Sequence, residues 1–145
     1  MILPDVTVLV RALRTDCPDH ERCRDWLEAT AAGPQAFGLS DLVLSGVTRV
    51  LTHPKVFHPP TPVDRVLDEL DRLRALPTCV LVSPGPRHWS IFTDLCRRAR
   101  AAGNLVPDAW FAALAMEHGA EWVTTDRDFA RFPGLRWRHP LDAAG

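Results

Sequence analysis

The sequence predicts a single α/β domain built around a parallel sheet. Short, continuously apolar segments alternate along the chain with longer segments in which apolar residues recur at helical spacing. Strands of a parallel sheet are buried on both faces by the helices that connect them, so they appear as short apolar runs. The chain has 145 residues, of which 46% are hydrophobic and 24% charged, as is ordinary for one globular domain. We therefore expect one domain over residues 1–145.

The first half of the chain begins with a strand that ends in an acid. Gly33 and Pro34 close a helical segment, and Ser40 or Asp41 can cap the next helix, which Pro54 ends. In order, we expect a strand at 1–6, helices at 8–13 and 20–31, a strand at 36–39, and helices at 42–51 and 63–76.

The second half repeats the alternation. Gly103 and Gly119 each follow a segment with helical spacing, and glycine commonly follows the end of a helix. In order, we expect a strand at 79–82, helices at 87–102 and 107–118, a strand at 122–124, a turn of helix at 126–132 and a strand at 135–137. The segment 79–82 is the clearest apolar run, which predicts a buried strand.

Charge and cysteine content limit the class of protein. The net charge is −1, so no overall positive field attracts nucleic acid. Lys55 is the only lysine, and arginine, which binds phosphate through a planar fork, supplies the remaining basic residues. The four cysteines show no CxxC pair and no zinc-ligand spacing. The sequence begins with no signal-peptide pattern and contains no apolar run of membrane-spanning length. We expect a cytoplasmic protein without a membrane partner.

Acidic residues follow strands where ligands gather in parallel sheets. Asp5 ends the first strand, Asp126 and Asp128 follow the strand at 122–124, and Asp108 lies in the first turn of a helix. Each acid alone is explained by helix capping. Together they are expected at one edge of the sheet, where carboxylates without basic partners repel one another unless a cation joins them.

Such a set of oxygen ligands suits a hard cation. Mg²⁺ and Mn²⁺ bind through a few carboxylates and keep several water molecules. A site of this kind can activate water for attack on a phosphodiester and stabilise the leaving oxygen. The residues therefore favour metal-assisted phosphodiester hydrolysis.

Four motifs resemble those of PIN-domain proteins, in the same order and over nearly the whole chain. The resemblance is closest to VapC-type toxins of bacterial toxin–antitoxin pairs. The motifs are 5–10 (DVTVLV), Ser40 with 49–54 (RVLTHP), 104–109 (NLVPDA) with 112–115 and 117–120, and 124–129 (TTDRDF).

The resemblance implies a fold, an activity and partners. The fold is a mostly parallel five-stranded sheet with helices on both faces. The activity is RNA hydrolysis that depends on Mg²⁺ or Mn²⁺, with Asp5, Asp108 and Asp126 catalytic and the metal held chiefly by Asp5 and Asp108. The partners are RNA, a second copy of the chain in a homodimer, and a VapB-like antitoxin that inhibits the enzyme in a heterotetramer or larger assembly.

The sequence departs from the family pattern at two positions. The second motif usually has a glutamate six residues after the serine, where this chain has Gly46, and the first motif often has asparagine where this chain has Thr7. Asp41 and Asp128 are the candidates to replace the missing carboxylate. Ser40 and Thr7 are candidates to orient ligands or water.

Two arginines are the candidate substrate-binding cations. Arg49 lies in the second motif, and Arg127 lies between Asp126 and Asp128. Either arginine can pair with RNA phosphate, or it can offset the nearby carboxylates in the metal-free protein. The missing glutamate leaves an alternative function open, in which a catalytically weakened PIN domain only binds RNA or an antitoxin.

Overall fold

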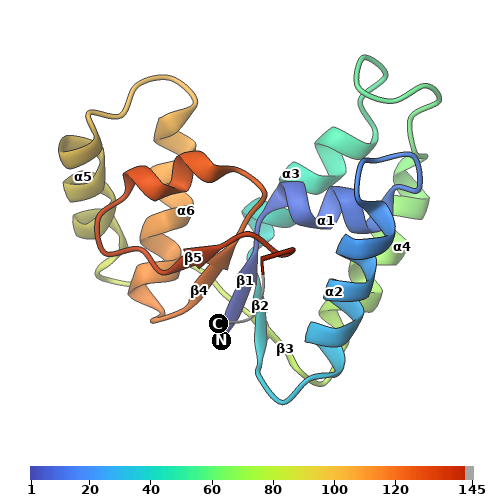
Figure 1. Ribbon diagram of the computed structural model, residues 1–145, viewed down its shortest axis with the longest axis horizontal. Coiled ribbons are helices and arrows are strands. Elements are labelled where there is room, and N and C mark those ends of the chain that lie inside the picture. Colours follow the sequence, from blue (N-terminus) through green and yellow to red (C-terminus); the bar gives the residue numbers. More distant parts are fainter. Residues whose placement is uncertain (143–145) are drawn as a thin grey trace.

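The computed structural model describes residues 1–142, which form an α/β fold around a five-stranded sheet (Figure 1). The strand order is β3-β2-β1-β4-β5, and every neighbouring pair is parallel. The predicted fold class is confirmed. The strands are β1 (Ile2–Pro4), β2 (Phe37–Leu39), β3 (Cys79–Leu81), β4 (Glu121–Val123) and β5 (Trp137–Arg138).

Between residues 1 and 142, six α-helices and one 3₁₀ helix connect the strands. Figure 1 places α5 and α6 on one side of the sheet and α1, α2 and α4 on the other, so both faces are covered. No helix in this part of the chain has both the length and the hydropathy needed to cross a membrane. The helices are α1 (Val6–Leu13), α2 (His20–Ala32), α3 (Asp41–Leu51), α4 (Val63–Arg74), α5 (His88–Ala99), α6 (Leu105–Glu117) and η1 (Arg127–Arg131).

The core lies between the sheet and the helices. Trp122 of β4 is fully buried, and its ring stacks on that of Phe111 from α6 with the centroids 5.3 Å apart. Phe129 of η1 packs against the same tryptophan at 5.5 Å. Burial of such large side chains is the main source of stability, and here it fixes α6 and η1 against the end of β4.

The burial of β3 differs from the sequence expectation. The apolar run at 79–82 predicted a buried strand, but β3 is an edge strand in which Val80 is 42% and Leu81 56% exposed. An apolar run does not distinguish a central strand from an edge strand, because strand order is set by the folding of the whole chain.

Several helices and strands begin or end at other residues than predicted. α1 begins at Val6 rather than residue 8, because Asp5 caps it directly after β1. α5 ends at Ala99, three residues early, where Arg100 takes a left-handed conformation with φ 49°. α6 begins at Leu105, two residues before its predicted start. These shifts leave each predicted acid at the same end of its element.

Candidate active site

Asp5 lies where the central strand β1 passes into α1, and it is only 6% exposed. Its Oδ1 accepts a hydrogen bond from the N–H of Val6 at 2.6 Å, and its Oδ2 accepts one from the hydroxyl of Thr124 at 2.6 Å. Burial raises the pKa of Asp5 to about 6, and the negative charge of Asp126 adds to the rise, while both hydrogen bonds lower it. Asp5 is therefore a buried carboxylate held in one orientation.

Thr124 is placed beside Asp5 by the register of two neighbouring strands. Pro4 of β1 pairs with Val123 of β4, so the next residue of each strand leaves the sheet at the same level. The fully buried hydroxyl of Thr124 donates to Asp5 and accepts the N–H of Asp126 at 3.0 Å. The sequence prediction gave Thr124 no role. The available signal was a polar residue directly after a buried strand, which the sequence prediction did not use.

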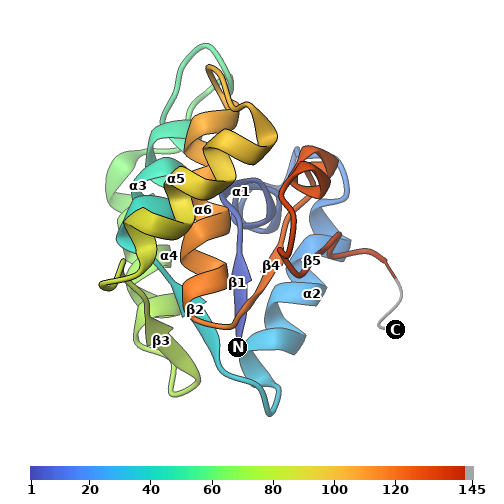
Figure 2. The same ribbon diagram turned by 90° about the vertical axis from the view of Figure 1, so that its left-hand side faces the viewer.

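Asp108, Asp126 and Asp128 lie near Asp5 at the same edge of the sheet. Asp108 is in the first turn of α6, and Asp126 caps η1 by accepting the N–H of Asp128 at 2.9 Å. The pKa of Asp108 is raised to about 6, chiefly by burial and in part by the negative charges of Asp126, Asp5 and Asp128. In Figure 2 β1 points toward the upper half of the molecule, where the upper part of α6 and the helix η1 lie. We call these four acids the carboxylate cluster.

The carboxylate cluster suits a hard divalent cation in its chemistry. Carboxylate oxygens are the ligands that Mg²⁺ and Mn²⁺ prefer, and a cation relieves the repulsion that raises the pKa of Asp108. Within residues 1–142, no three acidic, histidine or cysteine side chains are placed to hold an ion by themselves. Mg²⁺ usually binds through one or two carboxylates and keeps several waters. Asp5 and Asp108, with Asp126 beside them, meet that smaller requirement.

Ser40 and Thr7 lie beside the carboxylate cluster. Ile2 of β1 pairs with Phe37 of β2, and the same register continued puts Ser40 next to Asp5. Ser40 is 4% exposed, and its Oγ accepts the N–H of Val43 as the N-cap of α3. The hydroxyl of Thr7 lowers the pKa of Asp5 by hydrogen bonding.

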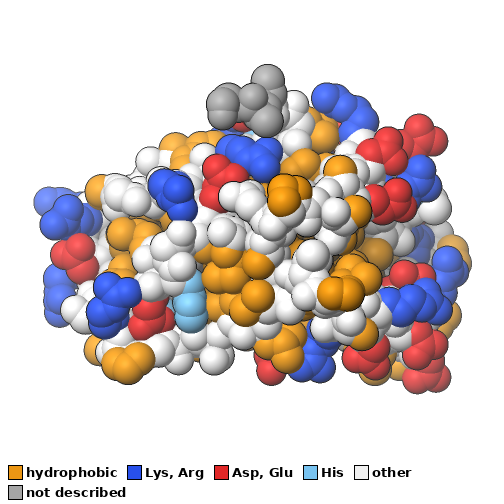
Figure 3. All heavy atoms as spheres, turned by 90° about the horizontal axis from the view of Figure 1, so that it is seen from below, with side chains coloured by type: hydrophobic (Ala, Val, Ile, Leu, Met, Phe, Trp, Pro, Cys, Tyr) orange, Lys and Arg blue, Asp and Glu red, His pale blue; other side chains and the backbone are white. Residues whose placement is uncertain are grey.

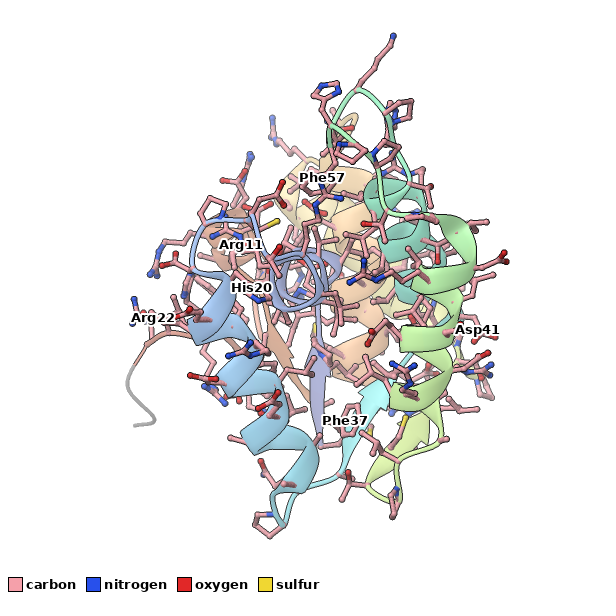
Figure 4. The ribbon with its side chains drawn as sticks, turned by 90° about the vertical axis from the view of Figure 1, so that its right-hand side faces the viewer. Arg11, His20, Arg22, Phe37, Asp41 and Phe57 are labelled. Carbon is pink, nitrogen blue, oxygen red and sulfur yellow. The ribbon has the colours of Figure 1, made fainter. Side chains whose placement is uncertain are left out.

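Asp41 points away from the carboxylate cluster. Its carboxylate lies 3.7 Å from the guanidinium of Arg74 on α4, and its side chain is 87% exposed. Figure 4 shows Asp41 on the α4 side of the molecule. Ser40 is the N-cap of α3, so Asp41 is the first residue of that helix, and its side chain leaves on the outer face. Of the two predicted substitutes for the missing carboxylate, the structure brings only Asp128 to the other acids.

The two predicted substrate-binding arginines lie on different surfaces. Arg49 is exposed in the last turn of α3 and lines a shallow groove between α3 and α4. Arg127 begins η1 between Asp126 and Asp128, and its guanidinium lies 3.3 Å from the carboxylate of Asp142. Only Arg127 is directly joined in the chain to members of the carboxylate cluster.

The side chain of Val6 lies against Gly46, the position where the family pattern has a glutamate. A Cβ atom placed on Gly46 would lie 2.9 Å from Cγ2 of Val6. That distance is shorter than ordinary van der Waals contact, so a larger residue at 46 requires the side chain of Val6 or one of the helices α1 and α3 to shift. Val6 thus occupies the space in which a longer side chain at 46 would begin.

Asp108 lies in the first turn of α6, and the last residue of the same helix, Glu117, is an acid whose carboxylate has hydrogen-bond donors. The carboxylate of Glu117 accepts the N–H of Gly85 at 2.7 Å and the N–H of Arg87 at 2.8 Å. Burial opposes its ionisation, but these hydrogen bonds hold the pKa of Glu117 below its usual value. Figure 3 views the molecule from below Figure 1 and shows acidic side chains interspersed with basic ones on that face.

The fold is that of a known class of protein. The PIN domain family profile matches residues 2–135. The chain therefore belongs to the PIN domain family. Among its relatives, ribonuclease VapC43 of Mycobacterium tuberculosis is 44% identical over 142 residues, which cover 98% of this chain and 97% of that protein.

Solved structures share the fold at lower sequence identity. VapBC2 from Rickettsia felis, bound to a DNA fragment from its promoter, superposes with a TM-score of 0.73 at 18% identity and covers 96% of this chain and 98% of the other. A toxin–antitoxin complex from Klebsiella pneumoniae superposes with a TM-score of 0.60 at 22% identity, covering 98% and 99%. The expected resemblance to VapC-type PIN domains is confirmed.

Proposed function

We propose that the protein is the toxin of a VapBC-type pair and a divalent-metal-dependent endoribonuclease. The observation that carries this proposal is the carboxylate cluster. Asp5 and Asp108 both have a pKa raised to about 6, and neighbouring acids contribute to both shifts. Its relatives named ribonuclease VapC support RNA as the substrate.

Each member of the cluster has its own part in the proposed reaction. Asp5 and Asp108 would hold Mg²⁺ or Mn²⁺, with Asp126 in the same pocket. The bound cation supplies a Lewis acid and lowers the pKa of a coordinated water. Thr124 keeps one oxygen of Asp5 occupied by a hydrogen bond, so the carboxylate cannot rotate freely. Asp128 adds negative charge beside Asp126, which strengthens the attraction for the cation.

The test compares two aspartates of the same chain. Asp5→Asn is expected to reduce RNA cleavage by about a thousandfold or more, because it removes a charge on which the site depends. Asp41→Asn is the matched control, since Asp41 lies outside the carboxylate cluster and is expected to leave cleavage unchanged. Cleavage of labelled RNA is followed with Mg²⁺, with Mn²⁺ and with excess chelator. Persistent cleavage by Asp5→Asn, or in chelator, would contradict the proposal.

A second candidate function rests on Gly46. Because Val6 closes the place of the usual glutamate, the site has one carboxylate fewer, and the domain would bind RNA or an antitoxin without cutting. Calorimetry with Mn²⁺ separates the two functions. Uptake of the ion at millimolar concentration, lost in Asp108→Asn, supports the nuclease. No uptake together with intact RNA binding supports the second function.

The proposed antitoxin has a candidate binding groove between α1, α2 and α4. The groove has a volume of about 560 Å³, and apolar side chains such as Leu27 and Leu73 line it between charged ones such as Arg24 and Glu69. An amphipathic helix places its apolar face into a groove of this kind. Leu73→Asp is expected to prevent capture of the co-expressed antitoxin, while Leu67→Asp, on the same helix but outside the groove, is expected to preserve it. Equal capture by both variants would exclude this groove.

We also propose that the chain forms a homodimer through the side of β3. Val80 and Leu81 of this edge strand are exposed, as is Leu42 at the start of α3. The backbone N–H and C=O groups of an edge strand can also pair with a strand of another chain. Light scattering after gel filtration is expected to give twice the mass of the chain. Leu81→Lys is expected to give a monomer. A monomeric wild-type protein would contradict this proposal.

A further inference from the structure

A group of basic residues from separate parts of the chain lies close together, and one of them, Arg127, stands between two members of the carboxylate cluster in the chain. Arg11 comes from α1, Arg22 from α2, Arg127 from η1, and His139 from the segment after β5. Figure 4 shows Arg11 and Arg22 on the same side of the molecule, where the chain approaches its C-terminus. In Figure 1 the segment after β5 crosses in front of β1 toward α1. The fold therefore gathers cations that are far apart in the sequence.

Two acids are interleaved with these cations. Asp19 lies 3.6 Å from Arg11 and 3.9 Å from Arg22, and Asp142 lies 3.3 Å from Arg127. Within the group, three arginines thus pair with two aspartates. The guanidinium groups of Arg22 and Arg127 are well exposed, at 65% and 64% of their side chains. Exposed ion pairs of this kind contribute little to stability, so another anion can replace the carboxylates.

His139 lies within this group and experiences the positive charge of Arg127 and Arg11. Burial lowers the pKa of His139, and so do Arg127 and Arg11, while Asp142 and Asp19 only partly offset them. Its Nδ1 accepts the N–H of Leu141 at 3.1 Å, so the ring carries its proton on Nε2 when neutral. The Nε2–H is then a donor beside the guanidinium groups of Arg127 and Arg11, which suits an anion.

Two features of the chain link this basic group to the carboxylate cluster. Arg127 is flanked in the chain by Asp126 and Asp128. Arg11 lies one helical turn after Thr7 on the same face of α1, and the hydroxyl of Thr7 lies near enough to Asp5 to lower its pKa. One turn is about 5.4 Å along the helix. When one phosphate of an RNA strand lies at the carboxylate cluster, the next phosphate along the same strand is therefore expected to reach the basic group.

We propose that Arg11, Arg127 and His139 form a subsite for a backbone phosphate of single-stranded RNA that flanks the bond to be cut. The inference rests on the proposed ribonuclease function and adds to it the place where the neighbouring part of the substrate is held. Asp19 and Asp142 occupy the guanidinium groups in the free protein, and the phosphate displaces them. Arginine pairs with phosphate through two parallel hydrogen bonds, which a lone carboxylate contact at 3.3–3.9 Å does not equal.

Asp19 shows that this arrangement is built into the backbone. It is one of two non-glycine residues with positive φ in residues 1–142, at φ 57°. Its side chain makes no capping hydrogen bond to α2, although it is the N-cap residue. In this backbone conformation the carboxylate of Asp19 lies between Arg11 and Arg22 and keeps the two guanidinium groups near each other.

The test measures RNA binding without cleavage. Fluorescence anisotropy of a labelled random-sequence 12-nucleotide RNA is recorded in EDTA over a series of salt concentrations. Arg127→Gln and Arg11→Gln are each expected to weaken binding by about three- to tenfold, and to reduce the slope of log K against log salt by about 0.7. Asp142→Asn is expected to strengthen binding by about two- to threefold, because it frees Arg127.

Arg72→Gln is the matched control. Arg72 pairs with Glu69 on α4 at 3.3 Å and is 72% exposed, much like Arg127, but it lies outside the basic group. It is expected to leave both affinity and salt slope unchanged. Thermal melting of every variant shows whether a weaker affinity reflects loss of folding.

The outcomes separate the subsite from the proposed function. Wild-type affinity in Arg127→Gln and Arg11→Gln, or no RNA binding by the wild-type protein, overturns the subsite. Weaker binding in these variants supports it even where the wild-type protein cleaves no RNA with Mg²⁺ or Mn²⁺, a result that would overturn only the ribonuclease.

Discussion

The two ends of helix α6 carry acids in opposite states. Asp108 in the first turn has a pKa raised to about 6, with burial and three neighbouring acids as the causes and no hydrogen bond among residues 1–142 to offset them. Glu117 in the last turn has a lowered pKa, because the N–H groups of Gly85 and Arg87 donate to it. A helix N-terminus favours a carboxylate and a C-terminus disfavours one, so the helix itself predicts the reverse.

The difference shows how to tell a structural acid from a functional one. The protein supplies Glu117 with its own donors, and in return the carboxylate fixes the loop between β3 and α5. Asp108 lacks such donors, so its charge remains available to a cation or a substrate. The contrast can be tested by exchanging each acid for its amide.

The largest expected effect is on activity. Asp108→Asn is expected to lower kcat/KM for RNA by about a hundredfold or more, because it removes a proposed metal ligand. Glu117→Gln is expected to keep the wild-type value at 20 °C. Steady-state kinetics with Mn²⁺ measures both variants. Equal losses of kcat/KM would show that Asp108 and Glu117 do not differ in their importance for activity.

The second effect is on stability, where the Glu117 variant rather than the Asp108 variant is expected to be impaired. Glu117→Gln is expected to lower the free energy of unfolding by about 1–3 kcal/mol, because the amide nitrogen cannot accept one of the two backbone N–H groups. Asp108→Asn in the metal-free protein is expected to raise it, because the substitution removes the cost of burying a charge and the repulsion from neighbouring acids. Urea unfolding in EDTA provides both values. A Glu117→Gln protein as stable as the wild type would show that the loop is held by other contacts.

The third effect concerns pH. The folded-state pKa of Asp5 and Asp108, about 6, lies above the unfolded value of roughly 3.9, so their contribution to stability is full below about pH 4 and is lost as pH rises through about 6. Glu117 has a lowered pKa, so its contribution is present above roughly pH 4.3 and is lost as pH falls through its folded value.

Melting temperatures in EDTA from pH 4 to pH 8 measure both contributions. Asp108→Asn is expected to lessen the loss toward pH 7, and Glu117→Gln to lessen the loss toward low pH. The same pH profile in both variants would mean that the two acids have similar pKa values.

The smallest effect is stabilisation by the cation. At ten times its Kd, Mn²⁺ is expected to stabilise the wild-type protein and Glu117→Gln by about 1.4 kcal/mol. Asp108→Asn is expected to gain much less. A melting curve with and without the ion measures the gain, and Ca²⁺ is a useful second ion. An equal gain in all three proteins would place the ion away from Asp108.

The sequence predicted the acids of the proposed site better than their surroundings. Asp5 and Asp108 were expected at one edge of the sheet, because parallel strands end at a common edge, and the structure brings them together there. Asp41 was misplaced because proximity in the chain to Ser40 does not fix the direction of a side chain on the first turn of a helix.

Other features depend on contacts that sequence spacing does not contain. Glu117 receives its donors from residues 85 and 87, thirty or more positions away. The exposure of Val80 and Leu81 follows from the position of β3 at the sheet edge. Neither the crossing of distant segments nor the order of strands is visible in a local pattern of apolar and polar residues.

The contact between Val6 and Gly46 fixes the order in which mutations at these positions are tolerated. A glutamate introduced at 46 while valine remains at 6 collides with Cγ2 of Val6, so the substitution is harmful in this background. A smaller residue at 6 removes the collision first, and the glutamate then becomes acceptable. The two positions are therefore coupled, and a glutamate at 46 is best introduced after Val6 is replaced by a smaller residue, through an intermediate with reduced packing between α1 and α3.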